Sequence, residues 1–179
     1  SKFSVYMVNE ILIMALFAIS LNFLLGYAGM VSFGQAAYYG IGAYTLALFV
    51  TKSNIPMWLA LAAAPVFSAL AALIIGYFCV RLTHIYFAML TMAFGQIVYA
   101  IAFKWYSFTG GDNGIVGINV PQFIATPINF YYFTLVIVAL SIIVLKKIVD
   151  SPFGCMLKAL RENPERTEFI GINVKIFQL

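Results

Sequence analysis

SPFGCMLKALRENPERTEFIG, residues 151–171, gathers both signs of charge in an otherwise apolar chain and orients everything before it. Ser151 and Asn163 each precede a proline. A capping Ser or Asn followed by proline at the first helical position is a helix-start signal. The stretch therefore predicts two short helices, the second ending at Gly171 in a left-handed turn. Apolar residues at helical spacing form one face of the first helix: Phe153, Met156, Leu157 and Leu160.

Residues 151–171, called the elbow from here on, allow two interpretations. An interfacial helix pair would anchor the end of a membrane span. A docking elbow for a soluble protein explains better why acidic and basic residues alternate, because a helix that binds lipid favours Lys and Arg alone. Both interpretations place the elbow at a membrane surface.

The composition indicates an integral membrane protein. The chain has 179 residues, of which 64% are apolar and 9% charged, whereas soluble domains carry about 25% charged residues. The apolar runs are long enough for helices, so we expect an all-α, polytopic helix bundle with about five spans of roughly 20 residues each. We treat residues 1–179 as a single transmembrane domain.

The basic residues set the orientation of this bundle. Six of the ten lie at the C-terminal end: Lys146, Lys147, Lys158, Arg161, Arg166 and Lys175. By the positive-inside rule this end is cytoplasmic. The five expected spans cover about 5–25, 35–50, 57–80, 85–103 and 128–145. Counting back places the start of the first span outside, which predicts at least one further span upstream.

Residues 26–35 interrupt the apolar pattern with three glycines in nine residues. Such a segment is either a tight turn between spans or a broken helix that lines a pathway, and we lean to the pathway. Asn22 has the alternative role of bonding a neighbouring helix. The candidates for the translocation pathway are Asn22, Gly26, Gly29, Gln35 and Gln96.

Two further patterns concern packing and the external face. Small residues recur every four positions in the third span and predict a close helix crossing: Ala60, Ala64, Ser68, Ala72 and Gly76. The longest loop, about 104–127, is either a glycine-rich turn or a re-entrant or gating segment. Its candidate residues are Gly110, Gly111, Asp112 and Asn113.

The residue types argue against chemistry in this chain. One histidine, two distant cysteines and no clustered carboxylates provide neither a catalytic set nor a metal site. The phosphate-loop pattern G-x-x-x-x-G-K is missing from the sequence, so ATP would be handled by another chain and we expect no cofactor bound here. An ion-coupled carrier or channel is the rival class, but it needs ionisable groups deep in the bilayer, and only Glu10, near an edge, qualifies.

Three stretches carry a family resemblance. They are LNFLLGYAGMVSFGQAAYYGIGAYTLAL (21–48), IYFAMLTMAFGQIVYA (85–100) with TGGDNGI (109–115), and SPFGCMLKALRENPERTEFIGINV (151–174). In that order they resemble segments of the M-type permease subunit of ATP-binding-cassette importers for branched-chain amino acids. Related permeases for urea or short amides carry similar motifs, so that cargo is the alternative.

The resemblance implies a multi-pass subunit of the inner membrane that works by alternating access. Its partners would be a second permease subunit, two cytoplasmic ATPase subunits and an external protein that delivers leucine, isoleucine or valine. The elbow would meet the ATPases through Lys158, Arg161, Glu162 and Gly171. The chain is shorter than this family: both ends look cut, and the spans expected after the elbow are absent. We therefore expect a fragment of a larger permease that does not transport alone.

Overall fold

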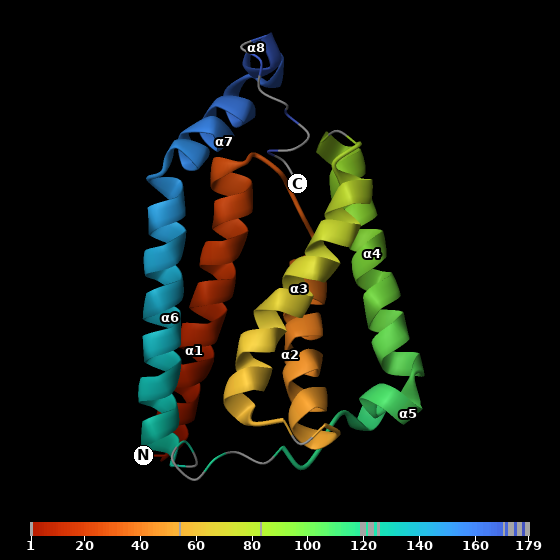
Figure 1. The fold of residues 1–179 in the computed structure, drawn as a ribbon, viewed down its shortest axis with the longest axis vertical. Coiled ribbons are helices and arrows are strands. Elements are labelled where there is room, and N and C mark those ends of the chain that lie inside the picture. Colours follow the sequence, from red (N-terminus) through yellow and green to blue (C-terminus); the bar gives the residue numbers. More distant parts are fainter. Residues whose placement is uncertain are drawn as a thin grey trace. The chain divides into compact units, whose positions relative to one another are not determined.

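The computed structural model describes residues 2–53, 55–82, 84–118, 121, 124, 126–169, 171, 174 and 177. Within them every regular element is helical, which confirms the all-α prediction (Figure 1). In chain order the elements are α1 Lys2–Asn22, the π-helical η1 Phe23–Tyr27, α2 Gln35–Thr51, α3 Met57–Cys79, α4 His84–Lys104, α5 Tyr106–Thr109, the 3-10 turn η2 Gly111–Asn113, α6 Pro127–Val149, α7 Pro152–Glu162 and α8 Pro164–Phe169.

Helices form at all five places where spans are expected. Among the described residues, four stretches are long and apolar enough to cross a membrane: Phe3–Tyr27, Met57–Cys79, Ile85–Lys104 and Pro127–Val149. The fifth helix, α2, has 17 residues. At 1.5 Å per residue it is about 26 Å long, slightly less than the roughly 30 Å of a bilayer core. The chain is thus a multi-pass membrane protein, and α2, although short, has the length expected for residues 35–50.

The chain divides into two compact units, the first made of Ser1–Met30 and Pro121–Gln178. In this unit α1 packs along α6, and both helices run towards the elbow (Figure 1). Helix α7 contacts both α6 and η1, and α8 packs on α7. The first unit therefore holds the elbow against the C-terminal ends of two membrane helices.

The second unit, Val31–Val120, is built on the pairing of α2 with α3, and α4 contacts both. At the crossing a Cβ on Gly42 would lie 3.7 Å from Ser68 Oγ and 4.0 Å from the carbonyl oxygen of Ala64. The Ser68 hydroxyl donates a hydrogen bond of 2.5 Å to the carbonyl of Tyr38. Small residues let the two backbones approach, so the close crossing predicted for the third span is confirmed.

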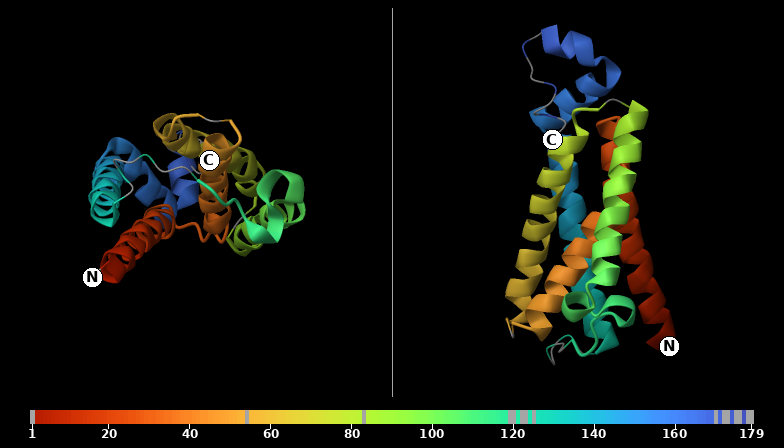
Figure 2. Two further views of the ribbon diagram at one scale, coloured as in Figure 1. Left: turned by 90° about the horizontal axis from the view of Figure 1, so that it is seen from below. Right: turned by 90° about the vertical axis from the view of Figure 1, so that its right-hand side faces the viewer.

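Turns and polar side chains lie at the ends of the helices of the second unit. Helix α5 turns off the end of α4 (Figure 2). At the other end of the unit, Arg81 donates a 2.5 Å hydrogen bond to the Tyr77 hydroxyl, and its guanidinium lies 4.6 Å from that ring's centroid. Polar and aromatic groups thus gather at the helix ends, where the membrane boundary is expected.

Candidate functional site

The elbow begins with a capped helix. Ser151 has an extended backbone, and its hydroxyl accepts the N–H of Gly154 at 3.4 Å, while Pro152 takes the first helical position. The same hydroxyl donates to the carbonyl of Ile148 at 2.6 Å. The predicted cap is confirmed, and the Ser151 hydroxyl also ties the start of α7 to the last turn of α6.

Helix α7 lies so close to the end of α6 that Gly154 has no room for a side chain. A Cβ there would overlap the carbonyl oxygen of Val149 and would lie 2.8 Å from that of Ile148. Leu157 and Leu160, each 3% exposed, follow Gly154 on the buried face of α7. Any larger residue at position 154 would have to push α7 away from α6.

The apolar face predicted for this helix is correct at its centre and only partial at its start. Leu157 and Leu160 are buried and Met156 is half-buried, but Phe153 is 43% exposed. The ring of Phe153 stacks on Phe177, with 5.7 Å between the ring centroids. The buried face of α7 is therefore centred on Gly154, Leu157 and Leu160.

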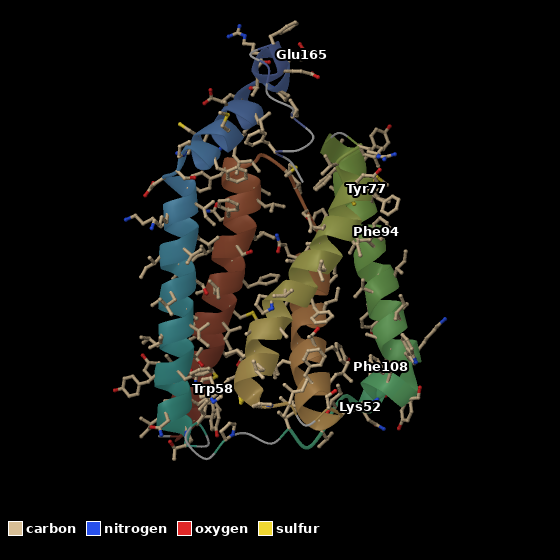
Figure 3. The ribbon with its side chains drawn as sticks, viewed as in Figure 1. Lys52, Trp58, Tyr77, Phe94, Phe108 and Glu165 are labelled. Carbon is tan, nitrogen blue, oxygen red and sulfur yellow. The ribbon has the colours of Figure 1, made fainter. Side chains whose placement is uncertain are left out.

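The second elbow helix also follows the prediction. The side-chain oxygen of Asn163 accepts the N–H of Arg166 at 3.0 Å. Gly171 has φ +88°, and its N–H donates to the carbonyl of Glu168 at 2.9 Å. The second helix is thus followed by a left-handed glycine, as predicted. Glu165 lies on α8, at the end of the elbow far from α6 (Figure 3).

Helix α1 ends in an unusual way. It widens into the π-helical turn η1, and Gly29 then takes a positive φ of 70°. The N–H of Met30 bonds the carbonyl of Leu24, six residues back, at 3.2 Å. A common glycine-terminated helix end reaches five residues back, so the extra residue matches the wider π turn. The helix thus breaks after Tyr27, before α2 begins at Gln35, and the pathway role of this break stays a prediction.

Two cations of the elbow reach this break. The Arg161 guanidinium donates through Nη1 to the carbonyl oxygen of Gly26. The Lys158 ammonium lies 5.3 Å from the centroid of the Tyr27 ring. Positive charge is favourable at the C-terminal end of a helix, where carbonyl groups lack partners. Arg161 therefore acts as a side-chain cap for α1.

Gly29 completes this contact because it lies under the Arg161 side chain. A Cβ on Gly29 would be 2.7 Å from Arg161 Cγ, and the positive φ also disfavours any residue with a Cβ. We call Gly26, Tyr27, Gly29, Lys158 and Arg161 the coupling junction. It joins two groups that the sequence treats separately, the pathway glycines and the elbow cations.

The other candidates lie apart from these contacts. Glu162 is exposed at the end of α7, and among the described residues the charged side chains of the elbow form no ion pair. Asn22 faces Gly26, since a Cβ on that glycine would lie 2.9 Å from Asn22 Oδ1. In the second unit, Gln35 starts α2 and Gln96 is exposed on α4. The pathway role of these residues stays a prediction.

The loop that is predicted to be external folds compactly around Thr109, which is 6% exposed. Its hydroxyl donates to the carbonyl of Ala102 at 2.5 Å, and its oxygen also accepts the N–H of Gly111 at 3.3 Å. Asn113 donates to the Tyr106 hydroxyl at 2.8 Å, while Asp112 is exposed. Gly110 has φ +80°. We call residues 105–114 the external knot.

Lys52, which the sequence analysis did not select, ties the α2–α3 turn to this knot. Its ammonium donates to the carbonyl of Ser107 at 2.9 Å and lies 4.8 Å from the Phe108 ring centroid (Figure 3). A lysine in a turn otherwise looks like an ordinary solvated charge. No sequence pattern indicates Ser107 as the partner of Lys52, because the two residues are 55 positions apart.

Comparisons with known proteins give one family match and two relatives. Residues 4–179 match the family model "Branched-chain amino acid transport system / permease component". The high-affinity branched-chain amino acid transport system permease protein LivM of Salmonella typhimurium strain LT2 is 28% identical over 200 residues, covering 97% of this chain and 47% of that protein. LivM of Escherichia coli strain K12 is 28% identical over 195 residues, covering 94% and 46%. No solved structure matches significantly. The chain spans about half the length of the curated relatives it matches.

Proposed function

Because the chain belongs to the family of branched-chain amino acid transport system permease components, we propose that it is part of the permease subunit of an ATP-driven importer for leucine, isoleucine and valine. The coupling junction is the observation that carries this proposal. It connects an amphipathic elbow directly to a break in a membrane helix, through the Arg161 contact with Gly26. A subunit driven by a soluble motor needs such a connection.

The proposed partners are those that the family match suggests for such a permease. ATP would be bound by two cytoplasmic ATPase subunits, which contact exposed residues of the elbow such as Glu162 and Glu165. A second permease subunit would complete the pathway in the cytoplasmic membrane, and an external binding protein would deliver the amino acid. The interleaved charges of the elbow support protein docking, because both signs of charge can be paired by a complementary surface.

The proposed mechanism is alternating access driven through the first unit. Closure of the ATPases pushes on α7, and α7 cannot move freely from α6 because the Ser151 hydroxyl and the tight contact at Gly154 connect them. Arg161 passes the displacement to the end of α1. The π-helical turn is the place where α1 can yield, because π turns are rare and occur mostly as single-turn bulges, frequently at functional sites. This chain supplies positioning and movement, and no covalent step.

The cargo is tested by uptake in cells that carry the full-length subunit with its complex. We expect labelled leucine to accumulate, with competition by isoleucine and valine but not by urea. Glu162→Lys should reduce leucine uptake strongly without loss of assembled complex, because the reversed charge would repel its docking partner. Accumulation of urea in place of leucine would show the amide branch of the family. Uptake that persists with inactive ATPase subunits would show an ion-coupled carrier.

A further inference from the structure

A groove between α1 and α6 opens at the elbow end of the first unit. It encloses about 260 Å³. Its walls are Ile19, Asn22, Phe23 and Tyr27 from α1 and η1, and Ile142, Leu145, Lys146, Val149 and Asp150 from α6 and its C-terminal cap. Both helices run towards the elbow. From Ile19 to Tyr27 and from Ile142 to Asp150 the lining spans about 12 Å along each helix, at about 1.5 Å per residue. The groove therefore has a membrane end and a cytoplasmic end.

The polarity of the lining changes along this direction. Ile19 and Ile142 begin the groove with aliphatic side chains, and Phe23 and Leu145 continue it beside the Asn22 amide. The last turns then bring polar groups, which are the Tyr27 hydroxyl, the Lys146 ammonium and the Asp150 carboxylate. A mainly apolar groove, with Asn22 as its one polar side chain before the charged end, matches the polarity of a phospholipid at a membrane surface.

The charges around the polar end are mainly positive. Lys146 and Asp150 are one helical turn apart, yet no ion pair joins them or any other described residue to Lys146. The Lys158 ammonium adds a second cation beside the groove, because it lies 5.3 Å from the ring centroid of Tyr27, which lines the groove. Two ammonium groups, those of Lys146 and Lys158, against one carboxylate favour an anionic ligand.

We propose that this groove binds an anionic phospholipid of the cytoplasmic leaflet, of the phosphatidylglycerol class. The phosphate would pair with Lys146, and the glycerol hydroxyls of the headgroup can donate to the Asp150 carboxylate. One acyl chain would lie along Phe23 and Leu145. Basic pockets between helices at the cytoplasmic boundary attract anionic lipids in this way. The proposal does not depend on the cargo or on ATP.

The test measures lipid on the purified full-length permease complex. The complex is exchanged into nanodiscs with equal parts of phosphatidylglycerol, phosphatidylethanolamine and phosphatidylcholine, and its retained lipids are counted by native mass spectrometry. We expect retained phosphatidylglycerol, reduced about fivefold in Lys146→Gln, the loss that one cation near an anionic headgroup accounts for. Lys147→Gln is the matched control. It removes the same charge from the next residue, which does not line the groove, so retention should change much less.

A second variant tests the apolar part of the site. Ile142→Trp should fill the groove and reduce retained phosphatidylglycerol while leaving every charge in place. Equal losses in Lys146→Gln and Lys147→Gln would overturn the proposal, because the effect would then be general surface charge. Preferential retention of phosphatidylethanolamine would overturn it too, since a zwitterionic headgroup could satisfy both Lys146 and Asp150. A wild-type complex without retained lipid would mean that protein fills the groove.

Discussion

At the residue scale, Gly29 is the position where backbone conformation and packing coincide. Gly29→Ala should destabilise the assembled permease, because a left-handed backbone costs an L-residue about 1–2 kcal/mol and the new methyl group would displace the Arg161 side chain. Gly117→Ala is the control, since Gly117 has φ +86° but open space around its Cβ position. Melting temperatures in detergent compare the two variants. An equal decrease in both would contradict the close contact between Gly29 and Arg161.

Single residues also show how far the sequence could be interpreted. The caps at Ser151 and Asn163 and the stop at Gly171 were predictable, because caps act on neighbours three or fewer positions away. The contact of Arg161 with Gly26 was not, because 135 positions separate the two residues. Periodicity within one helix contains no information on such a pair. The sequence identified each residue as a candidate and missed that they meet.

At the element scale, the position of α7 against α6 depends on Gly154. Gly154→Ala should move α7 away from α6, at a cost of about 1–3 kcal/mol for overpacking a tight contact. Hydrogen exchange of the α7 amides should then become faster, whereas Ala159→Ser, at an exposed position of the same helix, should have little effect. Unchanged α7 protection in Gly154→Ala would show that this helix is held by other contacts.

The external knot gives a second prediction about elements. Lys52→Met removes the hydrogen bond to Ser107 and the cation over the Phe108 ring, together about 1–2 kcal/mol for an exposed contact. The amides of residues 106–114 should exchange roughly tenfold faster if this tie limits their opening. Lys104→Met is the matched control at an exposed lysine on α4. Equal exchange rates of these amides in the two variants would show that the Lys52 contact does not stabilise residues 106–114.

Elements were predicted well where apolar periodicity decides them and less well where hydrogen-bond geometry does. Five helices form where apolar runs occur, and α2, at Gln35–Thr51, matches the predicted residues 35–50. The π-helical turn at Phe23–Tyr27 has no sequence signature of its own, because it differs from an α-helix by one residue in its bonding pattern. The glycines after it marked the break without giving its form.

At the scale of the whole molecule, the family prediction is confirmed. The family was identified from three separated motifs and holds over residues 4–179. The chain covers 47% of the Salmonella relative, so the pathway and the partners stay proposals about the full-length protein. The exposed apolar side chains on all the long helices fit a bundle that is covered by lipid and by further protein. Sequence could not rank the pathway candidates, because a pathway is defined by all the helices around it.

The coupling junction is tested most directly by the number of ATP molecules hydrolysed per leucine imported, measured on the complete complex in proteoliposomes. Arg161→Ala should keep ATP hydrolysis but import leucine at least tenfold more slowly, because the elbow would lose its hold on the Gly26 carbonyl. Arg166→Ala, which removes an exposed arginine from α8, should leave the ratio close to that of the wild type. A wild-type ratio in Arg161→Ala, or an equal loss in Arg166→Ala, would contradict the coupling role of this junction.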